Sequence, residues 1–202
     1  MDTRNLTRAA RASHTLLLAL LLLGVQGCRS QSLRPTQLSE NAVRLDLPLV
    51  LQDDLYGCGL ASVATLCQYW GVAIPEQERA ALAETANQSE GLSGGELLAA
   101  LRRVGLEVYL FQGTRDRSLT GLYAHVDAGR PLLVMLSPDG EDRHYGLVLG
   151  YDEPRGNVIL LDPLRGEVLT SVSAFDRDWE RCQRFTLLAC PSTSSTPEGS
   201  IP

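Results

Sequence analysis

The sequence predicts an α+β domain in which helices come first and an antiparallel sheet follows. Three helical segments with recognisable ends occupy the first half of the chain, and six short apolar runs bounded by turn residues occupy the second half. Helices and strands segregated in this way are typical of α+β domains. We therefore expect one folded domain over residues 44–190, with the N-terminal helices packed on the sheet.

The helices are marked by the residues at their ends. They are predicted at residues 58–70, 75–87 and 93–105. Gly71 ends the first, because glycine readily adopts the left-handed conformation that follows a helix. Pro75 opens the second, since the first helical position needs no N–H group. Ser93 and Glu96 have the spacing of a capping box, which opens the third.

The strands are apolar runs separated by Gly, Pro, Asp and Asn. They are predicted at residues 106–111, 131–137, 144–152, 157–163, 167–172 and 184–190. Valine, leucine and aromatic residues are frequent in them, as strand propensity requires. A short helical stretch near residues 121–130 interrupts the series.

The two ends of the chain lie outside this domain. Residues 1–27 combine an arginine-bearing start, a short apolar run and small residues, which is the order found in secretory signal peptides. The sequence VQGC, ending at Cys28, resembles a bacterial lipobox; the alternative is an ordinary signal peptide in which Cys28 is incidental. Residues 28–43 are then a polar tether. Residues 191–202, rich in Ser, Thr and Pro, are expected to form a disordered tail.

These ends predict an exported protein. A lipidated Cys28 would anchor the domain to the periplasmic face of a bacterial membrane, and Arg29 in place of an aspartate favours the outer membrane. The net charge of the full chain is −6, and all 18 of its cationic side chains are arginines. Nucleic acid is excluded as a partner, because phosphate binding needs clustered positive charge.

Four cysteines remain in the domain: Cys58, Cys67, Cys182 and Cys190. The first two lie about 13 Å apart on one predicted helix. The last two lie more than about 20 Å apart along one predicted strand. A disulfide needs Cα atoms within about 7 Å of each other, so both local pairings are excluded. A long-range pair such as Cys67 with Cys190 stays open.

Cys58 is the candidate nucleophile. It begins a helix, where the helix dipole and the unpaired N–H groups favour a thiolate over a thiol. Gly57 and Gly59 on either side would leave room for a substrate backbone to approach. The competing interpretation is a small buried cysteine without a chemical role. A base near the thiol would decide between the two.

His144 is the candidate base. Of the other two histidines, His14 lies in the signal peptide and His125 has no neighbouring acid. His144 begins one strand, Asp162 ends the next, and a hairpin pairs position 144 with residues 162–164. Cross-strand neighbours have Cβ atoms about 5 Å apart. Asp162 can therefore orient the His144 ring and complete a nucleophile–base–orienter triad.

Gln52 precedes the cysteine by six residues. Its side-chain amide and the backbone N–H of Cys58 could together donate hydrogen bonds to an oxyanion; the alternative is an exposed glutamine at the end of a strand. The acidic stretch SPDGEDRH at residues 137–144 has no spaced His or Cys ligands. We expect no metal and no cofactor.

The segment LQDDLYGCGLASVATLCQYWG at residues 51–71 resembles the motif of the bacteriocin-processing, double-glycine-leader cysteine peptidases, cysteine peptidase family 39. That pattern is a glutamine, a Cys-Gly pair six residues later, and a helix ending in aromatic residues and glycine. HYGLVLGYD, LLDPLRGEV and FDRDW fit the later part of the family pattern. Gly57 is a departure, because family members often carry an acid before the cysteine. The resemblance spans Gln52 to about Ala189.

The resemblance implies a papain-like fold and a cysteine endopeptidase. Its substrate would be an exported peptide or a secreted fibre subunit, cleaved after a small Gly-Gly-like pair, with a secretion apparatus as a further partner. Two alternatives stay open: a leader-binding lipoprotein adaptor without catalysis, and a papain-fold transferase or amidase. The matched catalytic residues are Cys58, His144, Asp162 and Gln52.

Overall fold

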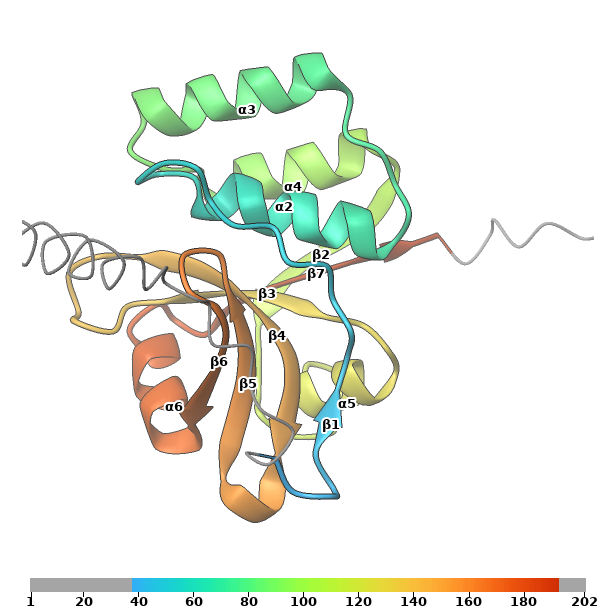
Figure 1. Cartoon of the computed structure of the whole chain (residues 1–202), viewed down its shortest axis with the longest axis vertical. Helices are drawn as coiled ribbons and strands as arrows, with labels where there is room; N and C mark the ends of the chain where they lie inside the picture. The colour runs from blue at the N-terminus through green and yellow to red at the C-terminus, as the bar shows by residue number, and fades with distance from the viewer. Residues whose placement is uncertain (1–37, 193–202) are drawn as a thin grey trace, which may run out of the picture. The chain divides into compact units, whose positions relative to one another are not determined.

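The computed structural model describes residues 38–192 (Figure 1). The expected signal peptide at residues 1–27, the lipidation site Cys28 and the chain from residue 193 onward lie outside the described residues. Within the described range no helix is both long and apolar enough to span a membrane.

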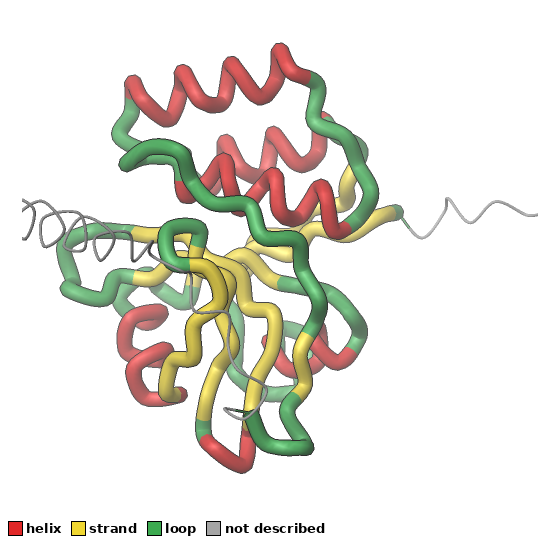
Figure 2. Tube along the Cα trace, in the orientation of Figure 1, coloured by secondary structure: helices red, strands yellow, loops and turns green. Residues whose placement is uncertain are grey.

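Seven strands form one antiparallel sheet, with the order β2-β7-β3-β4-β5-β6 and with β1 paired to β4. The strands are β1 (Val43–Arg44), β2 (Leu106–Gln112), β3 (Leu132–Leu136), β4 (His144–Asp152), β5 (Asn157–Asp162), β6 (Gly166–Ser171) and β7 (Phe185–Pro191). The helices are α2 (Cys58–Tyr69), α3 (Glu76–Gln88), α4 (Gly94–Arg103), α5 (Leu122–Asp127), the 3₁₀ turn η2 (Glu153–Arg155) and α6 (Val172–Glu180). The predicted α+β class is confirmed, with the helical part and the strands in the expected order along the chain (Figure 2).

The sheet is covered on both faces. Strand β5 shows this directly, because Ile159 and Leu161 belong to the core beneath α2, α3 and α4, whereas Val158 and Leu160 belong to a second core with residues of α5 and α6. Successive side chains of a strand point to opposite faces. A strand buried on both faces therefore reads as a continuous apolar run rather than an alternating one. Figure 1 shows α2, α3 and α4 grouped together, apart from α5 and α6.

Helix α2 is buried along most of its length, which explains its nearly uninterrupted apolar sequence. Helix α4 is capped as predicted. The Ser93 hydroxyl accepts from the Glu96 N–H at 3.3 Å, and the Glu96 carboxylate accepts from the Ser93 N–H at 2.6 Å. Helix α2 contacts β4, and helix α4 contacts β2 and β7. The two helices also pack on each other, and this packing keeps the N-terminal end of α2 beside the start of β4.

Three features differ from the expectations. Helix α6 has no predicted counterpart; it buries Phe175 and Trp179 against the second core. Part of the expected tether at residues 28–43 is folded onto the domain, since Ser39 binds the Asp152 carboxylate through both its N–H and its hydroxyl. The first two residues of the expected tail at residues 191–202 are held by the domain, because Pro191 pairs with Leu106 and the Ser192 hydroxyl donates to the Glu107 carboxylate; the residues from 193 onward lie outside the described range.

The pairing of β1 with β4 requires a residue without a side chain at position 150, which is Gly150. A Cβ atom at this position would lie 2.3 Å from the carbonyl oxygen of Val43. We expect Gly150→Ala to lower the free energy of unfolding by about 2 kcal/mol, because the backbone of β1 would have to move away. Urea unfolding measures this change. Gly95→Ala, in helix α4, would place the new methyl group in ordinary contact with the Ser93 hydroxyl oxygen at 3.9 Å and should instead raise stability by up to about 1 kcal/mol. Equal effects at both glycines would contradict the steric explanation.

Candidate active site

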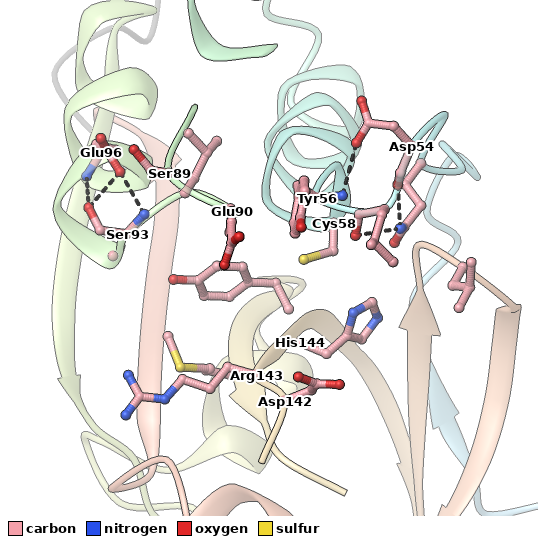
Figure 3. A pocket seen from close by; sticks show the side chains of 18 of the residues that line it. Asp54, Tyr56, Cys58, Ser89, Glu90, Ser93, Glu96, Asp142, Arg143 and His144 are labelled. Carbon is pink, nitrogen blue, oxygen red and sulfur yellow. Dashed lines mark hydrogen bonds between the residues drawn. The ribbon is translucent and has the colours of Figure 1, made fainter. Parts of the chain in front are cut away.

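A cleft of about 1190 Å³ lies between the helical part and the start of β4. Its walls come from the loop before α2, the loop between α3 and α4, and the loop between β3 and β4. Cys58 and His144 both line it, and Figure 3 shows them approaching one another from α2 and β4. Gln52 also lines the cleft. Sequence positions far apart thus meet around one cavity.

Cys58 is the first residue of helix α2 and is 8% exposed. Burial by itself raises the pKa of its thiol, but hydrogen bonding to His144, to the backbone of Tyr145 and to the backbone of Gly59 outweighs burial and lowers the pKa below the ordinary value. The start of a helix also favours negative charge. No acidic side chain in the first turn of α2 opposes this effect. The surroundings of Cys58 therefore favour the thiolate.

His144 is held by the carboxylate of Asp162, with 3.0 Å between Nε2 and Oδ1. The two strands pair antiparallel, as predicted, and Leu147 lies opposite Leu161. His144 and Asp162 are therefore not directly opposite each other, and the His144 side chain reaches Asp162 diagonally at the end of the hairpin. Burial lowers the pKa of His144, but hydrogen bonds to Asp162 and Cys58 raise it, with a net result of about 9. Since Nε2 faces Asp162, Nδ1 is the ring nitrogen left for the thiol.

Asp162 has further partners that sequence reasoning did not find. Its Oδ1 accepts from the Leu164 N–H at 2.8 Å, and its Oδ2 accepts from Nε of Arg165 at 2.7 Å. Burial raises the pKa of Asp162, but the bonds to His144, Leu164 and Arg165 bring it well below the usual range. The carboxylate is consequently ionised and fixed in orientation. The only sequence signal for this is the short turn DPLRG, which returns Arg165 toward Asp162.

Gln52 lies in the cleft, but its side-chain amide is turned toward its own loop. Nε2 donates to the carbonyl oxygen of Asp54 at 2.7 Å, and Leu55 offers a second carbonyl at 3.4 Å. Oε1 is buried and has no hydrogen-bond partner among the described residues. The predicted oxyanion role of Gln52 would need the amide to turn toward Cys58. The backbone N–H groups at the start of α2, which a helix leaves unpaired, are already next to the thiol.

Gly57 and Gly59 are explained by packing. A Cβ atom at Gly57 would meet Asp54 and Gln52 at 3.1 and 3.2 Å, and one at Gly59 would meet Leu92 at 3.2 Å. The space at both glycines is thus taken by the protein's own side chains. This packing gives both glycines a role that is independent of a substrate, because they allow the loop and helix α4 to approach α2. That they leave room for a substrate backbone stays a prediction.

The four described cysteines are free thiols, so the long-range pairing of Cys67 with Cys190 is not formed. Cys67 lies on the same helix as Cys58, yet burial raises its pKa to about 11. The pKa values of the two thiols on α2 are thus shifted in opposite directions. Among residues 38–192 no group of three or more His, Cys, Asp or Glu side chains is arranged to hold a metal ion.

Comparison with known proteins shows the family and the fold of the chain. Residues 44–186 match the model of the Peptidase_C39 like family. The chain is 30% identical over 132 residues to an uncharacterized protein of Methanothermobacter thermautotrophicus, covering 65% of this chain and 82% of that protein. It is 21% identical over 131 residues to the lactococcin-G-processing and transport ATP-binding protein LagD of Lactococcus lactis subsp. lactis. That match covers 65% of this chain but only 17% of LagD.

Two solved structures show a similar fold. The peptidase domain of Streptococcus ComA, a bi-functional ABC transporter involved in a quorum-sensing pathway, superposes with a TM-score of 0.58 at 21% identity, covering 71% of this chain and 98% of that domain. A double glycine motif protease from an AMS/PCAT transporter, solved in complex with the leader peptide, superposes with a TM-score of 0.55 at 19% identity, covering 74% of this chain and 94% of the other. The predicted papain-like peptidase fold is confirmed. With a family model spanning nearly all of the folded domain, this chain belongs to the Peptidase_C39 like family.

Proposed function

We propose that this protein is a cysteine endopeptidase that cuts after a small-residue pair such as Gly-Gly in an exported peptide or secreted fibre subunit. The observation that carries the proposal is the chain of contacts from Cys58 through His144 to Asp162 at the edge of an open cleft. A structural cysteine would have no need of a base held by a buried carboxylate. The surroundings of the three side chains favour a thiolate beside an imidazolium, which is the resting state of a thiol peptidase.

The proposed reaction follows from these positions. The Cys58 thiolate attacks the carbonyl carbon of the scissile bond, and the C=O electron pair moves onto the oxygen. The oxyanion accepts hydrogen bonds from N–H groups at the start of α2. His144 then gives its proton to the leaving amine, the C–N bond breaks, and a thioester remains. Water, deprotonated by His144, hydrolyses the thioester and restores the thiolate. Asp162 keeps the ring oriented throughout.

The proposed substrate class rests on the relatives. One of the similar structures is a double glycine motif protease bound to a leader peptide, and LagD is named for processing and transport of lactococcin G. A leader peptide ending in two small residues would suit attack at a thiol that is only 8% exposed, because small side chains let the scissile carbonyl come close to Cys58. The signal-like start and Cys28 extend the proposal to an exported protein on a membrane surface.

The test uses purified full-length protein and synthetic peptides with a central Gly-Gly or Gly-Ala pair. We expect mass spectrometry to detect cleavage after the second small residue, and we expect Cys58→Ala to stop it. Cys190→Ala is the matched control, because Cys190 lies on β7 outside the cleft and its loss should leave cleavage intact. Binding without cleavage by the unmodified protein would support the adaptor instead. Acyl transfer to an added amine in preference to water would support the transferase.

A further inference from the structure

The cleft around Cys58 is strongly acidic. Its lining contains six carboxylates and a single arginine, Arg143. The carboxylates are Asp53, Asp54, Glu90, Glu96, Glu141 and Asp142. Five of them come from three separate loops and Glu96 from the first turn of α4. Figure 3 shows Asp54, Glu90 and Asp142 on different sides of Cys58. A ligand at the thiol would therefore meet negative charge in several directions.

These carboxylates are left without cationic partners. None of the six forms an ion pair within residues 38–192. Acids elsewhere on the domain do find arginines: Glu78 pairs with Arg103, and Asp176 pairs with Arg115. Residues 38–192 contain 13 arginines, yet Arg143 is the only one of these 13 that reaches the cleft lining. Unrelieved like charges in a cleft focus the field and attract ligands of the opposite charge.

A second feature of the cleft also indicates a ligand. Tyr145 lines the cleft and is only 5% exposed, but its hydroxyl has no hydrogen-bond partner among the described residues. A buried hydroxyl without a partner is costly unless a ligand or water supplies one. Burial, followed by the nearby Cys58, raises the pKa of this phenol, so the hydroxyl stays protonated and can donate. A peptide carbonyl is an acceptor that would satisfy it.

The nature of the ligand follows from how these groups are arranged. A divalent cation needs several oxygen ligands converging on one point, and the described residues contain no such cluster. The carboxylates instead lie on several walls of a cleft that also contains a thiol. Lys or Arg side chains spread along a peptide fit this arrangement, because each can reach a different wall while the backbone passes Cys58 and Tyr145.

We propose that the cleft selects cationic peptides, with Lys or Arg side chains on both sides of the small-residue cleavage site. This inference rests on the proposed peptidase function for the position of the scissile bond, but the charge preference is a property of binding. Selection should act mainly on KM, since the carboxylates attract the peptide before and during the reaction to a similar extent.

The test compares three peptides of equal length with a central Gly-Gly pair flanked by lysines, by glutamines or by glutamates. Binding is measured by fluorescence anisotropy, and cleavage by kcat and KM. We expect the lysine peptide to bind about tenfold more tightly than the glutamine peptide, and the glutamate peptide more weakly than both. Added salt should reduce the differences, because these carboxylates are exposed and screened.

Two triple variants that remove the same number of negative charges test whether the preference for lysine peptides arises in the cleft. Glu90→Gln with Glu141→Gln and Asp142→Asn removes three cleft charges and should abolish most of the lysine preference. Glu40→Gln with Asp46→Asn and Glu84→Gln removes the same charge outside the cleft lining and should preserve the preference. Equal loss in both variants would assign the effect to net charge and overturn a cleft-specific preference.

The outcomes separate this inference from the proposed function. Cleavage of all three peptides with equal KM would overturn the charge preference and leave the peptidase standing. Tight, salt-sensitive binding of the lysine peptide without cleavage would support the preference and overturn the peptidase. Absence of both binding and cleavage for all three peptides would overturn both.

Discussion

Peptide cleavage by the Asp162→Asn variant should fall by about three to four orders of magnitude in kcat. Asp162 holds the His144 ring through a 3.0 Å bond and is the carboxylate that keeps the ring protonated. Asparagine has nearly the same shape, but a neutral amide cannot stabilise an imidazolium, and its NH₂ group can hold the ring in the wrong tautomer. Burial would then lower the pKa of His144 without opposition from Asp162.

Steady-state kinetics on a Gly-Gly peptide measure this effect. Asp176→Asn is the matched control, because Asp176 lies on helix α6 outside the cleft lining and is also an ion-paired aspartate, with Arg115 as its partner. Its kcat should be unchanged. Circular dichroism and thermal unfolding of both variants show whether the fold persists. A folded Asp162→Asn protein retaining more than about a tenth of the original kcat would contradict the triad.

Replacing His144 with alanine should remove the ability of Cys58 to react with iodoacetamide at acidic pH. In the unmodified protein the pKa of Cys58 is lowered, so its thiolate persists below the usual range, and His144 stays protonated beside it until about pH 9. Without the ring, burial remains as the largest influence on Cys58 and raises the pKa of the thiol. At pH 6 the labelling rate should fall about tenfold for each unit by which the pKa rises, because each unit of pKa changes the thiolate fraction tenfold.

Peptide mass spectrometry follows the labelling of each cysteine against pH in the same sample. Cys190 serves as the internal reference, since burial raises the pKa of its thiol and it should react only at alkaline pH in both proteins. If the Cys58 profile were identical in the two proteins, with Cys58 reduced and accessible, His144 would not be the activating base. The leader-binding adaptor would then become the better account.

Much of the site follows from local sequence. Cys58 can be placed at a helix start because Gly71 and the apolar run fix the helix, and helix formation depends on neighbouring residues. His144 and Asp162 are only 18 residues apart, and a hairpin turn between two apolar runs brings them together without reference to the rest of the chain. The capping box at Ser93 is similarly local.

Other features depend on contacts between distant segments. Helix α6 is stabilised by burying Phe175 and Trp179 against the second face of the sheet, and a helix of nine residues is too short to be stable without such packing. The turn of the Gln52 amide toward Asp54 and the bond from Arg165 to Asp162 are set by loop geometry, which residue spacing does not define.

The sequence by itself determined the order of elements, the helix that presents Cys58 and the hairpin that joins His144 to Asp162, because each depends on interactions between residues near one another in the chain. Only the tertiary structure decided which side chains share the cleft. The six carboxylates and the Tyr145 hydroxyl come from segments separated by up to about ninety residues, and their shared charge arises only when the helices pack on the sheet. Long-range packing, rather than local propensity, sets that arrangement.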